Sequence, residues 1–512
     1  MQAILLPAVL GVAVRLAMLP WAGAPAPSVH DEFAYLLAAD TFASGRAANP
    51  PHPMRTFFES MHVIVEPTYA AKYPPTQGLA LALGQAVFLH PWAGVLLSTA
   101  GMAAAAGWML RGWLSPGWAI LGGLLMAFQY GVCSYWVNSY WGGAAAALGG
   151  ALLLGAWRRL TTAADSARHP FHAALLALAM GILANSRPWE GLILCLPLGT
   201  IFLLWVLREG PRRRAERLRR ALLPFALTFA TAMAATSWYC WRVTGDPLQL
   251  PYTVHEEQYS MLPLLPWQHP RPEPAYRHAE IRRFHTEWAL MHQADGLPQD
   301  RPLWLAQLPG KLAVLTRAIV SPTLMAFGTA CYALLAWLAW RRREFRVPTL
   351  LLGCFVMGIA VQRVLELHYL APAVPLFLLL QLGFLRQING LRYRGRRLGQ
   401  AVAAAGILAG ATTLWFSWQA ESRQDEFGIA RQRMERRLEA MPGRHVVIVR
   451  YSPQHDVTKE WVYNRADIDG ARIVWARWQG EQKNQELFEY FRGRRFWLLE
   501  PDAAPAAIVP LR

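Results

Sequence analysis

Long apolar runs dominate this chain and restrict it to a helical membrane protein. Of its 512 residues, 54% are hydrophobic, and many lie in runs of about 17–25 residues. Inside a bilayer every backbone polar group needs an internal partner, so such runs cross as helices. The sequence predicts a polytopic α-helical fold with about 11 spanning helices. They are expected over residues 3–22, 92–110, 115–135, 143–157, 171–186, 189–207, 221–241, 318–340, 347–363, 369–386 and 398–418.

Arginine clusters between these runs predict the orientation of the chain. Residues 76–89 are apolar but short, so we expect a helix that lies in, or re-enters, the outer leaflet. With this segment excluded, all four clusters fall on the cytoplasmic side together with the N-terminus, as the positive-inside rule requires. The net charge of +17 then reflects topology and attraction to anionic lipid rather than nucleic-acid binding. The clusters are Arg158-Arg159, Arg208 to Arg220, Arg341 to Arg346 and Arg386 to Arg397.

Three polar regions are expected to face the opposite, periplasmic side. A first loop covers about residues 23–75 and a second loop about 242–317, both within a membrane module of residues 1–420. The tail, residues 421–512, begins with a charged helical stretch. It continues with the strand-like runs "HVVIVRY", "ARIVWARW" and "RFWLLEP" and the helical pattern "NQELFEYFRG". These runs predict a small α/β domain.

The motif His30-Asp31-Glu32 follows the first apolar run directly. A carboxylate at a membrane interface is costly unless it is hydrated, paired or bound to metal. One interpretation is a general base that removes a proton from an acceptor hydroxyl or amine. The other is a helix N-terminus, where Asp31 and Glu32 in the first turn suit the helix dipole. Both can hold, because a helix N-terminus also fixes a carboxylate rigidly.

The rest of the first loop contains candidate ligands for metal and phosphate. His52, His62 and Glu66 are candidates for a divalent cation, although their spacing fits no compact metal motif. Lys72 could bind a phosphate as a point charge, or it could be a solvated lysine at the interface. Tyr73 and the two prolines that follow it end the loop and direct the next segment into the membrane.

Other helix ends on the same side also contain polar residues. Asn138 lies in "YWVNSYWGG", which an aromatic belt alone would explain. Arg187 and Glu190, in "NSRPWEG", could pair with each other, or the arginine could clamp a phosphate. Arg363 lies in "QRVLELHYLAP". Arg187 and Arg363 both break the positive-inside rule on the side of the acidic motif, where a lipid-phosphate leaving group would need cations.

The acidic motif after the first helix and the "KYPP" segment before the next one resemble the catalytic signature of the C-type (GT-C) glycosyltransferases. The resemblance covers roughly the first 200 residues and is strongest to protein O-mannosyltransferase-like and aminoarabinose-transferase-like bacterial members. It implies an inner-membrane enzyme that takes a sugar from a polyprenyl-phosphate donor on the outer face, with inversion. By resemblance, Asp31 or Glu32 matches the family base, and we favour Asp31. Lys72 and Tyr73 match the conserved loop.

The resemblance is incomplete, and two other functions remain as alternatives. "YWVNSYWGG" stands where the family often has an aromatic-Ser-Arg stretch with a downstream acid, which puts the acceptor class in doubt. A transporter of lipid-linked sugars would need charged or broken helices near the bilayer midplane. An O-antigen polymerase or ligase would keep its key residues in a large late loop, such as the second loop. The candidate substrate-binding residues are His30, Tyr73, Asn138, Glu190, His368 and Tyr369, and the candidate phosphate-binding residues are Lys72, Arg187 and Arg363.

Overall fold

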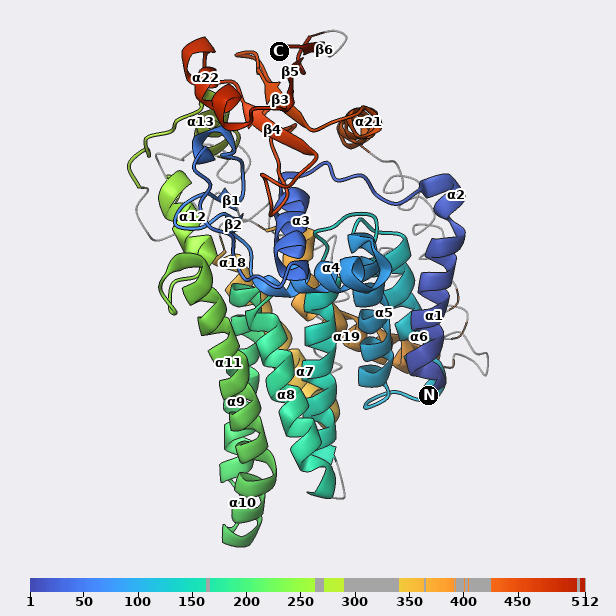
Figure 1. The fold of residues 1–512 in the computed structure, drawn as a ribbon. Coiled ribbons are helices and arrows are strands. Elements are labelled where there is room, and N and C mark those ends of the chain that lie inside the picture. The colour runs from blue at the N-terminus through green and yellow to red at the C-terminus, as the bar shows by residue number, and fades with distance from the viewer. Residues whose placement is uncertain are drawn as a thin grey trace, which may run out of the picture.

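The computed structural model describes residues 1–162, 166–262, 271–289, 340–362, 365–390, 392, 400, 404, 425–503 and 507–511. Within these residues a bundle of helices carries a cap formed by the first loop and the tail (Figure 1). Five of the described helical segments are long and apolar enough to cross a membrane. They are Pro91–Leu110, Ser166–Ala184, Pro188–Leu207, Pro211–Thr244 and Leu367–Asn389. The chain is therefore a helical membrane protein, as predicted.

Helices occur at the predicted positions wherever those positions are described. The predicted spans 318–340 and 398–418 lie outside the described residues, so the number of eleven stays a prediction. Several helices start with proline in the first turn, where its missing N–H costs nothing. The helices of the bundle are α1 (Gln2–Ala17), α2 (Leu19–Ala22), α5 (Pro91–Leu110), α6 (Pro116–Ala127), α7 (Ala144–Thr162), α8 (His169–Ala184), α9 (Pro188–Leu207), α10 (Pro211–Arg217), α11 (Leu223–Thr244), α18 (Arg346–Ala360), η8 (Leu367–Ala373) and α19 (Val374–Asn389).

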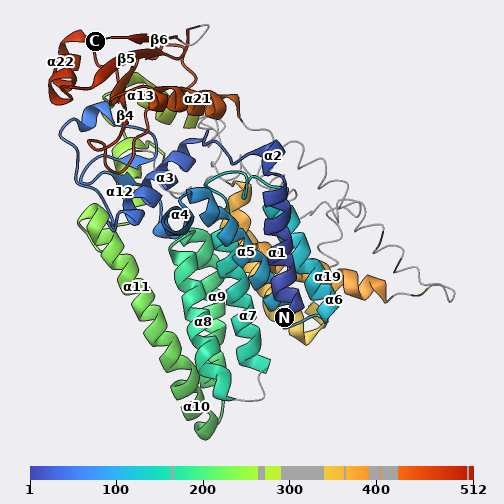
Figure 2. The same ribbon diagram turned by 45° about the vertical axis from the view of Figure 1, so that its right-hand side comes forward.

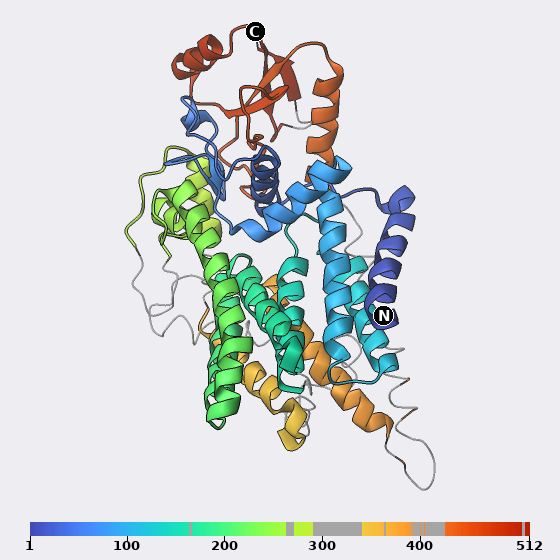
Figure 3. The same ribbon diagram turned by 60° about the horizontal axis from the view of Figure 1, so that its bottom comes forward.

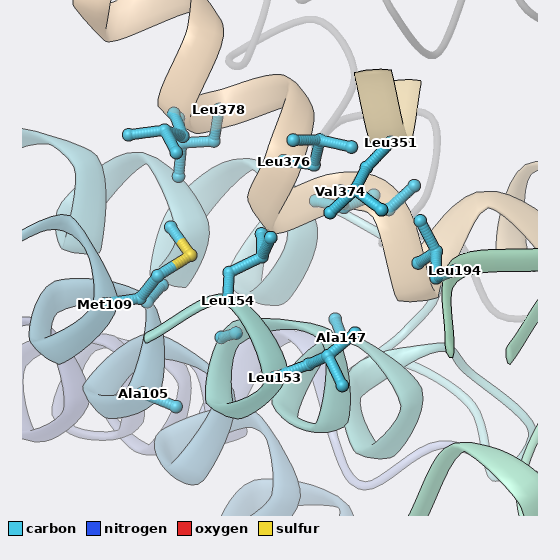
Figure 4. Packing of buried hydrophobic residues seen from close by; sticks show 14 of the residues in the cluster. Ala105, Met109, Ala147, Leu153, Leu154, Leu194, Leu351, Val374, Leu376 and Leu378 are labelled. Atoms are coloured by element: carbon cyan, nitrogen blue, oxygen red, sulfur yellow. The ribbon is translucent and has the colours of Figure 1, made fainter. Parts of the chain in front are cut away.

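The core of the bundle lies where α5, α7, α9, α18 and α19 meet. Figure 4 shows aliphatic side chains from these helices pointing toward one another, among them Met109, Leu154 and Leu376. Small residues bring the backbones close: a Cβ on Gly150 of α7 would lie 1.9 Å from the carbonyl oxygen of Pro372 in η8. Such close approach is the usual source of packing energy between helices in lipid, where no hydrophobic force drives association.

Helix α4 (Pro75–Phe88) is the short apolar helix expected over residues 76–89. It lies across the end of the bundle rather than along it (Figure 3). One side of α4 is buried against α3 and α5, whereas Leu79, Leu83 and Val87 are more than half exposed. An apolar exposed face on a helix at the end of a bundle suits a position in the headgroup region of a leaflet.

The arginine clusters gather at the end of the bundle away from the tail. Arg158 of α7 donates to the carbonyl of Gly112 at 2.9 Å, and Arg386 of α19 donates to the carbonyl of Trp113 at 3.3 Å. Helix α10, which holds a third cluster, lies at the same end in Figures 1 and 2, far from α3 and the tail. This arrangement agrees with the clustering on one side that the sequence predicts.

The tail contains a four-stranded sheet of order β4-β3-β5-β6, parallel except for β6. Its strands β3 (His445–Val449), β4 (Ile473–Arg477) and β5 (Arg495–Glu500) form from the three strand-like runs of the sequence, and β6 (Ala507–Pro510) completes it. Helices α21 (Glu426–Ala440) and α22 (Glu481–Tyr490) flank the sheet. One hydrophobic cluster joins this sheet to α3 (His30–Ala43) and to the first loop with β1 (Val63–Ile64) and β2 (Ala70–Ala71). The tail and the first loop therefore share a core.

Candidate active site at the start of helix α3

The two adjacent carboxylates at the start of α3 have different environments. Glu32 is 2% exposed, and its oxygens accept three backbone N–H groups: Ser28 at 2.8 Å, Val29 at 3.0 Å and Tyr140 at 3.0 Å. Glu32 therefore caps α3 and ties it to the segment before α7. The capping function that the sequence offered for either acid belongs to Glu32, whose buried oxygens are both engaged by backbone N–H groups.

This environment makes Glu32 sensitive to pH. Burial raises the pKa of Glu32 to about 7, although the three N–H groups oppose the shift. The folded state then holds its proton more tightly than the unfolded state, so this residue's contribution to stability is complete below about pH 4.5 and is lost as the pH rises toward about 7. We expect the wild-type protein in detergent to lose more thermal stability than a Glu32→Gln variant between pH 5 and pH 8. An equal loss in both proteins would contradict this assignment.

Asp31 is the accessible carboxylate. Its side chain is 22% exposed and accepts a short hydrogen bond from the hydroxyl of Tyr73. The Nε2 atom of His62 lies 3.8 Å from its second oxygen. An ionised carboxylate has about four acceptor positions, so Asp31 keeps the capacity to take a proton from a bound substrate. Predicted site residues Asp31, Tyr73 and His62 are thus brought together.

Arg187 reaches the same group of side chains from the start of α9. The Tyr73 ring stacks on Tyr35 at 4.5 Å, and the guanidinium carbon of Arg187 lies 4.8 Å from the centre of the Tyr369 ring. Burial raises the pKa of Tyr35 to about 12, and both Arg187 and Asp31 act electrostatically on that phenol. Arg187 and Asp31 therefore both lie near one cluster of tyrosines, Tyr35, Tyr73 and Tyr369.

Lys72 is not the solvated interfacial lysine that the sequence allowed. It is 5% exposed, and its Nζ lies 3.4 Å from the carboxylate of Glu256 in α12 (Pro251–Tyr259). The rings of Tyr252 and Tyr73 lie 4.9 and 5.6 Å from the same nitrogen. The acidic partner comes from the second loop, about 180 residues away, and nothing in the sequence pairs the two.

A cluster of histidines lies beside Asp31, and the sequence pointed to only two of its members. The ring centre of Phe284 lies 4.9, 5.6 and 5.0 Å from the ring centres of His30, His62 and His285. The ring centres of His255 and His62 are 5.9 Å apart. Burial lowers the pKa of all four, that of His255 to about 4. These imidazoles are therefore neutral at physiological pH. His255 and His285 were missed because they belong to the second loop.

The three metal candidates of the first loop do not form a common site. His52 pairs with Asp469 of the tail at 3.1 Å, and Glu66 pairs with Arg55 at 2.7 Å, whereas His62 faces Asp31. A divalent site needs several of its ligands to converge on one point. The candidates His52, His62 and Glu66 therefore do not converge on one metal site in this structure. In the part of the chain that the structure describes, no three His, Cys, Asp or Glu side chains are placed to hold a metal ion.

Asn138 makes structural contacts, and its expected contact with substrate stays a prediction. Its carbonyl oxygen accepts a hydrogen bond from Arg15 of α1 at 2.9 Å, and its amide donates to the backbone of Ser134 at 2.9 Å. Arg15 also contacts the face of Trp92 at 4.6 Å. The contacts of Arg15 could not be predicted from the sequence, because Arg15 lies inside a predicted span where a charge is unexpected.

The remaining predicted residues lie around Arg187. Glu190 accepts a hydrogen bond from Gln362 at 2.9 Å, and its charge also acts on Arg187. His368 shares a hydrogen bond of 3.0 Å with the hydroxyl of Tyr135. Arg363 lies outside the described residues, so its predicted contact with phosphate stays a prediction.

Comparison with known proteins gives matches in structure but not in sequence. No family model and no curated protein matches the chain. ArnT from Cupriavidus metallidurans bound to undecaprenyl phosphate is similar with a TM-score of 0.52 and 14% identity, over 96% of this chain and 92% of that one. The oligosaccharyltransferase of Archaeoglobus fulgidus, tethered with an acceptor peptide containing the NVT sequon, is similar with a TM-score of 0.54 and 12% identity, over 98% and 69%.

The same oligosaccharyltransferase in its apo form gives a TM-score of 0.51 and 13% identity, and the aligned region spans 88% of this chain but only 62% of that enzyme. These similarities establish the fold. The chain shares its fold with these two membrane transferases, and the fold that the resemblance predicted is confirmed.

Proposed function

We propose that this chain is a membrane glycosyltransferase that moves a sugar from a polyprenyl-phosphate donor to a lipid, glycan or protein acceptor. The observation that carries the proposal is Asp31, a partly exposed carboxylate that keeps free acceptor positions, whereas the neighbouring Glu32 is used for capping. The GT-C architecture, shared with an ArnT solved with undecaprenyl phosphate, supports a lipid-linked donor.

The reaction that fits this site is an inverting displacement. An acceptor O–H or N–H attacks the anomeric carbon of the donor sugar, and Asp31 takes the proton as the new bond forms. The bond from the anomeric carbon to the phosphate oxygen breaks, and the phosphate leaves with the electron pair. Because a phosphate is already a good leaving group, the step needs a base and a cation but no strong general acid.

Arg187 is the best-placed cation for the donor phosphate. Lys72 is closely paired with Glu256, whereas Arg187 contacts the Tyr369 ring and acts on the same tyrosine, Tyr35, as Asp31 does. Its planar fork of donors suits bidentate contact with phosphate oxygens. Lys72 and Arg363 remain proposed secondary contacts.

We expect Arg187→Gln to weaken binding of undecaprenyl phosphate by ~10–100-fold, because charge-assisted hydrogen bonds contribute about 1.5–3 kcal/mol. Titration of the purified protein in detergent, followed by native mass spectrometry, measures the affinity. Arg242→Gln is the matched control, since Arg242 is an exposed arginine near the end of α11 and outside the site. Equal affinities of Arg187→Gln and wild type would exclude Arg187 as the phosphate ligand.

The proposed location is the inner membrane of a bacterium, with the N-terminus cytoplasmic. In this orientation the periplasmic side holds both loops. It also holds the tail, which is the expected domain of residues 421–512. The gathering of arginines at the end of the bundle away from the tail supports this orientation. The donor, a lipid, would approach Asp31 from the outer leaflet.

A comparison of envelope glycans and glycoproteins tests the function as a whole. Mass spectrometry of a deletion strain and its parent should show one sugar modification that disappears with the gene. Return of the wild-type gene should restore it, and return of the Asp31→Asn gene should not. Identical glycan profiles in the deletion strain and the parent would overturn the proposal.

A further inference from the structure

Arg477, at the end of β4, joins three segments that are far apart in the sequence. Its side chain is 2% exposed, and its Nε donates to the carbonyl oxygen of Glu59 in the first loop at 2.6 Å. It forms a short ion pair with Glu460 of the tail. It also lies 3.6 Å from the carboxylate of Glu280 in α13 (Ala279–Arg283) of the second loop. One guanidinium thus holds the tail against both loops.

A second contact from the tail fixes the same part of the first loop. The hydroxyl of Tyr463 donates to the carbonyl oxygen of Met61 at 3.2 Å, and its ring stacks on Phe33 of α3 at 4.4 Å. The backbone from Glu59 to Met61 is therefore held at both of its ends by side chains of the tail. Figure 3 shows the tail, in orange and red, next to α3 and the first loop, in dark blue.

The residue that follows this fixed segment is His62, which faces Asp31. Its φ of 64° is in the left-handed region, which side chains other than glycine seldom adopt, so neighbouring contacts must maintain it. Its own carbonyl accepts the backbone N–H of Lys72 at 3.1 Å. Tyr463 holds Met61 and the backbone of Lys72 holds His62. The imidazole of His62 lies among the rings of Phe284, Tyr73 and His255, with its Nε2 3.8 Å from Asp31.

We propose that Arg477 is a positioning residue for the transfer reaction, because it fixes the segment from Glu59 to His62 so that the His62 imidazole stays beside the Asp31 carboxylate. The proposal rests on the proposed function, in which Asp31 is the base. A neutral imidazole that tightens onto the carboxylate when substrate binds would hold it in the orientation needed for proton transfer. A displacement of about 1 Å in such a group is enough to cost ~10²-fold in rate. The tail is then a part of the catalytic unit.

The test uses the full-length protein and two measurements that separate binding from reaction. The first is the initial rate at which the glycan modification reappears after induction in the deletion strain, per amount of protein. The second is the affinity of the purified protein for undecaprenyl phosphate. We expect Arg477→Met to lower the rate by ~10²-fold and to leave the affinity within about 2-fold, because Arg187 is untouched. Arg477→Lys keeps the charge and should recover part of the rate.

Arg450→Met is the matched control. Arg450 directly follows β3 and donates to Glu500 of β5 at 2.9 Å. This pair is more exposed than that of Arg477 and stays within the tail. The control should lose its ion pair and retain the wild-type rate. If Arg477→Met does not fold, Tyr463→Phe gives the decision, since it removes only the hydroxyl that holds Met61 and keeps the ring on Phe33; we expect ~10-fold loss of rate.

The outcomes separate this proposal from the function on which it rests. Folded Arg477→Met and Tyr463→Phe proteins that transfer at the wild-type rate, while Asp31→Asn does not, would overturn the positioning function of Arg477 and leave the proposed base in place. An Asp31→Asn protein with the wild-type rate would overturn the base, and with it any positioning of that base. A fall in undecaprenyl phosphate affinity in Arg477→Met that equals the fall in rate would show a general structural effect and also count against the proposal.

Discussion

Replacement of Asp31 by asparagine should lower the rate of sugar transfer by ~10²–10⁴-fold, the usual cost of losing a general base. Asparagine keeps the size of the side chain and can still accept a hydrogen bond from Tyr73, but its amide cannot take a proton from the acceptor. The fold should be unaffected, since Glu32 rather than Asp31 accepts the backbone N–H groups at the start of α3. The measurement is the rate of glycan modification in the deletion strain, with thermal unfolding of the purified variant as the control for stability.

Two further results sharpen this test. Asp31→Asn should bind undecaprenyl phosphate with about the wild-type affinity, because removal of a carboxylate takes no hydrogen-bond donor away from the phosphate. A stable Asp31→Asn protein with undiminished transfer would falsify the assignment. Loss of activity together with loss of folding would instead point to a structural role, which the single contact of Asp31 with Tyr73 and its distance from His62 make unexpected.

The sequence predicts the bundle well because each helix is marked by features within its own stretch of sequence. An apolar run of spanning length, a proline at its start and an arginine at its far end are local features, and α5 and α9 follow from them almost residue by residue. Helix α4 was also recognisable, because fourteen residues are too few to span. The strands of the tail follow from short β-rich runs in the same way.

The site is less predictable, because its partners come from segments far apart in the chain. Asp31, Tyr73 and Arg187 could be selected as polar residues at helix ends, and the structure brings them together. The pairing of Lys72 with Glu256 depends on where the second loop folds, and no spacing records that. The same holds for Arg477, which the sequence presents as one more residue of a β-strand.

The metal candidates of the first loop could not be judged from the sequence for a related physical reason. His52 and Glu66 are the right residue types for a divalent cation, but composition does not show which of them already have partners. Asp469 of the tail pairs with His52, and Arg55 of the first loop pairs with Glu66. An ion pair on a protein surface and a metal ligand use the same carboxylates and imidazoles, so only the fold decides between them.

Replacement of Glu32 by alanine should cost the protein on the order of 3 kcal/mol of stability. The change leaves three backbone N–H groups without their acceptor, and an unsatisfied buried donor costs roughly 1–3 kcal/mol. The N–H of Tyr140 is buried, so loss of its acceptor costs the full desolvation free energy. The N–H groups of Ser28 and Val29 are partly buried, so water can compensate for part of their loss. Thermal unfolding in detergent measures the loss. Asp40→Ala is the comparison on the same helix: it removes the acceptor of one backbone N–H, that of Ala466, and of the side-chain amide of Gln85, and it should cost less.

The structural use of Glu32 also predicts how its activity and stability separate. Because Glu32 reaches no group of the proposed reaction, Glu32→Ala protein that is still folded at low temperature should retain most of its transfer rate, whereas Asp31→Asn should lose it at any temperature. The two neighbouring acids are therefore expected to give different phenotypes. Loss of Glu32 lowers stability, and loss of Asp31 lowers the rate of transfer. A Glu32→Ala protein that is as stable as wild type but inactive would reverse the assignment, and Glu32 would then be the base.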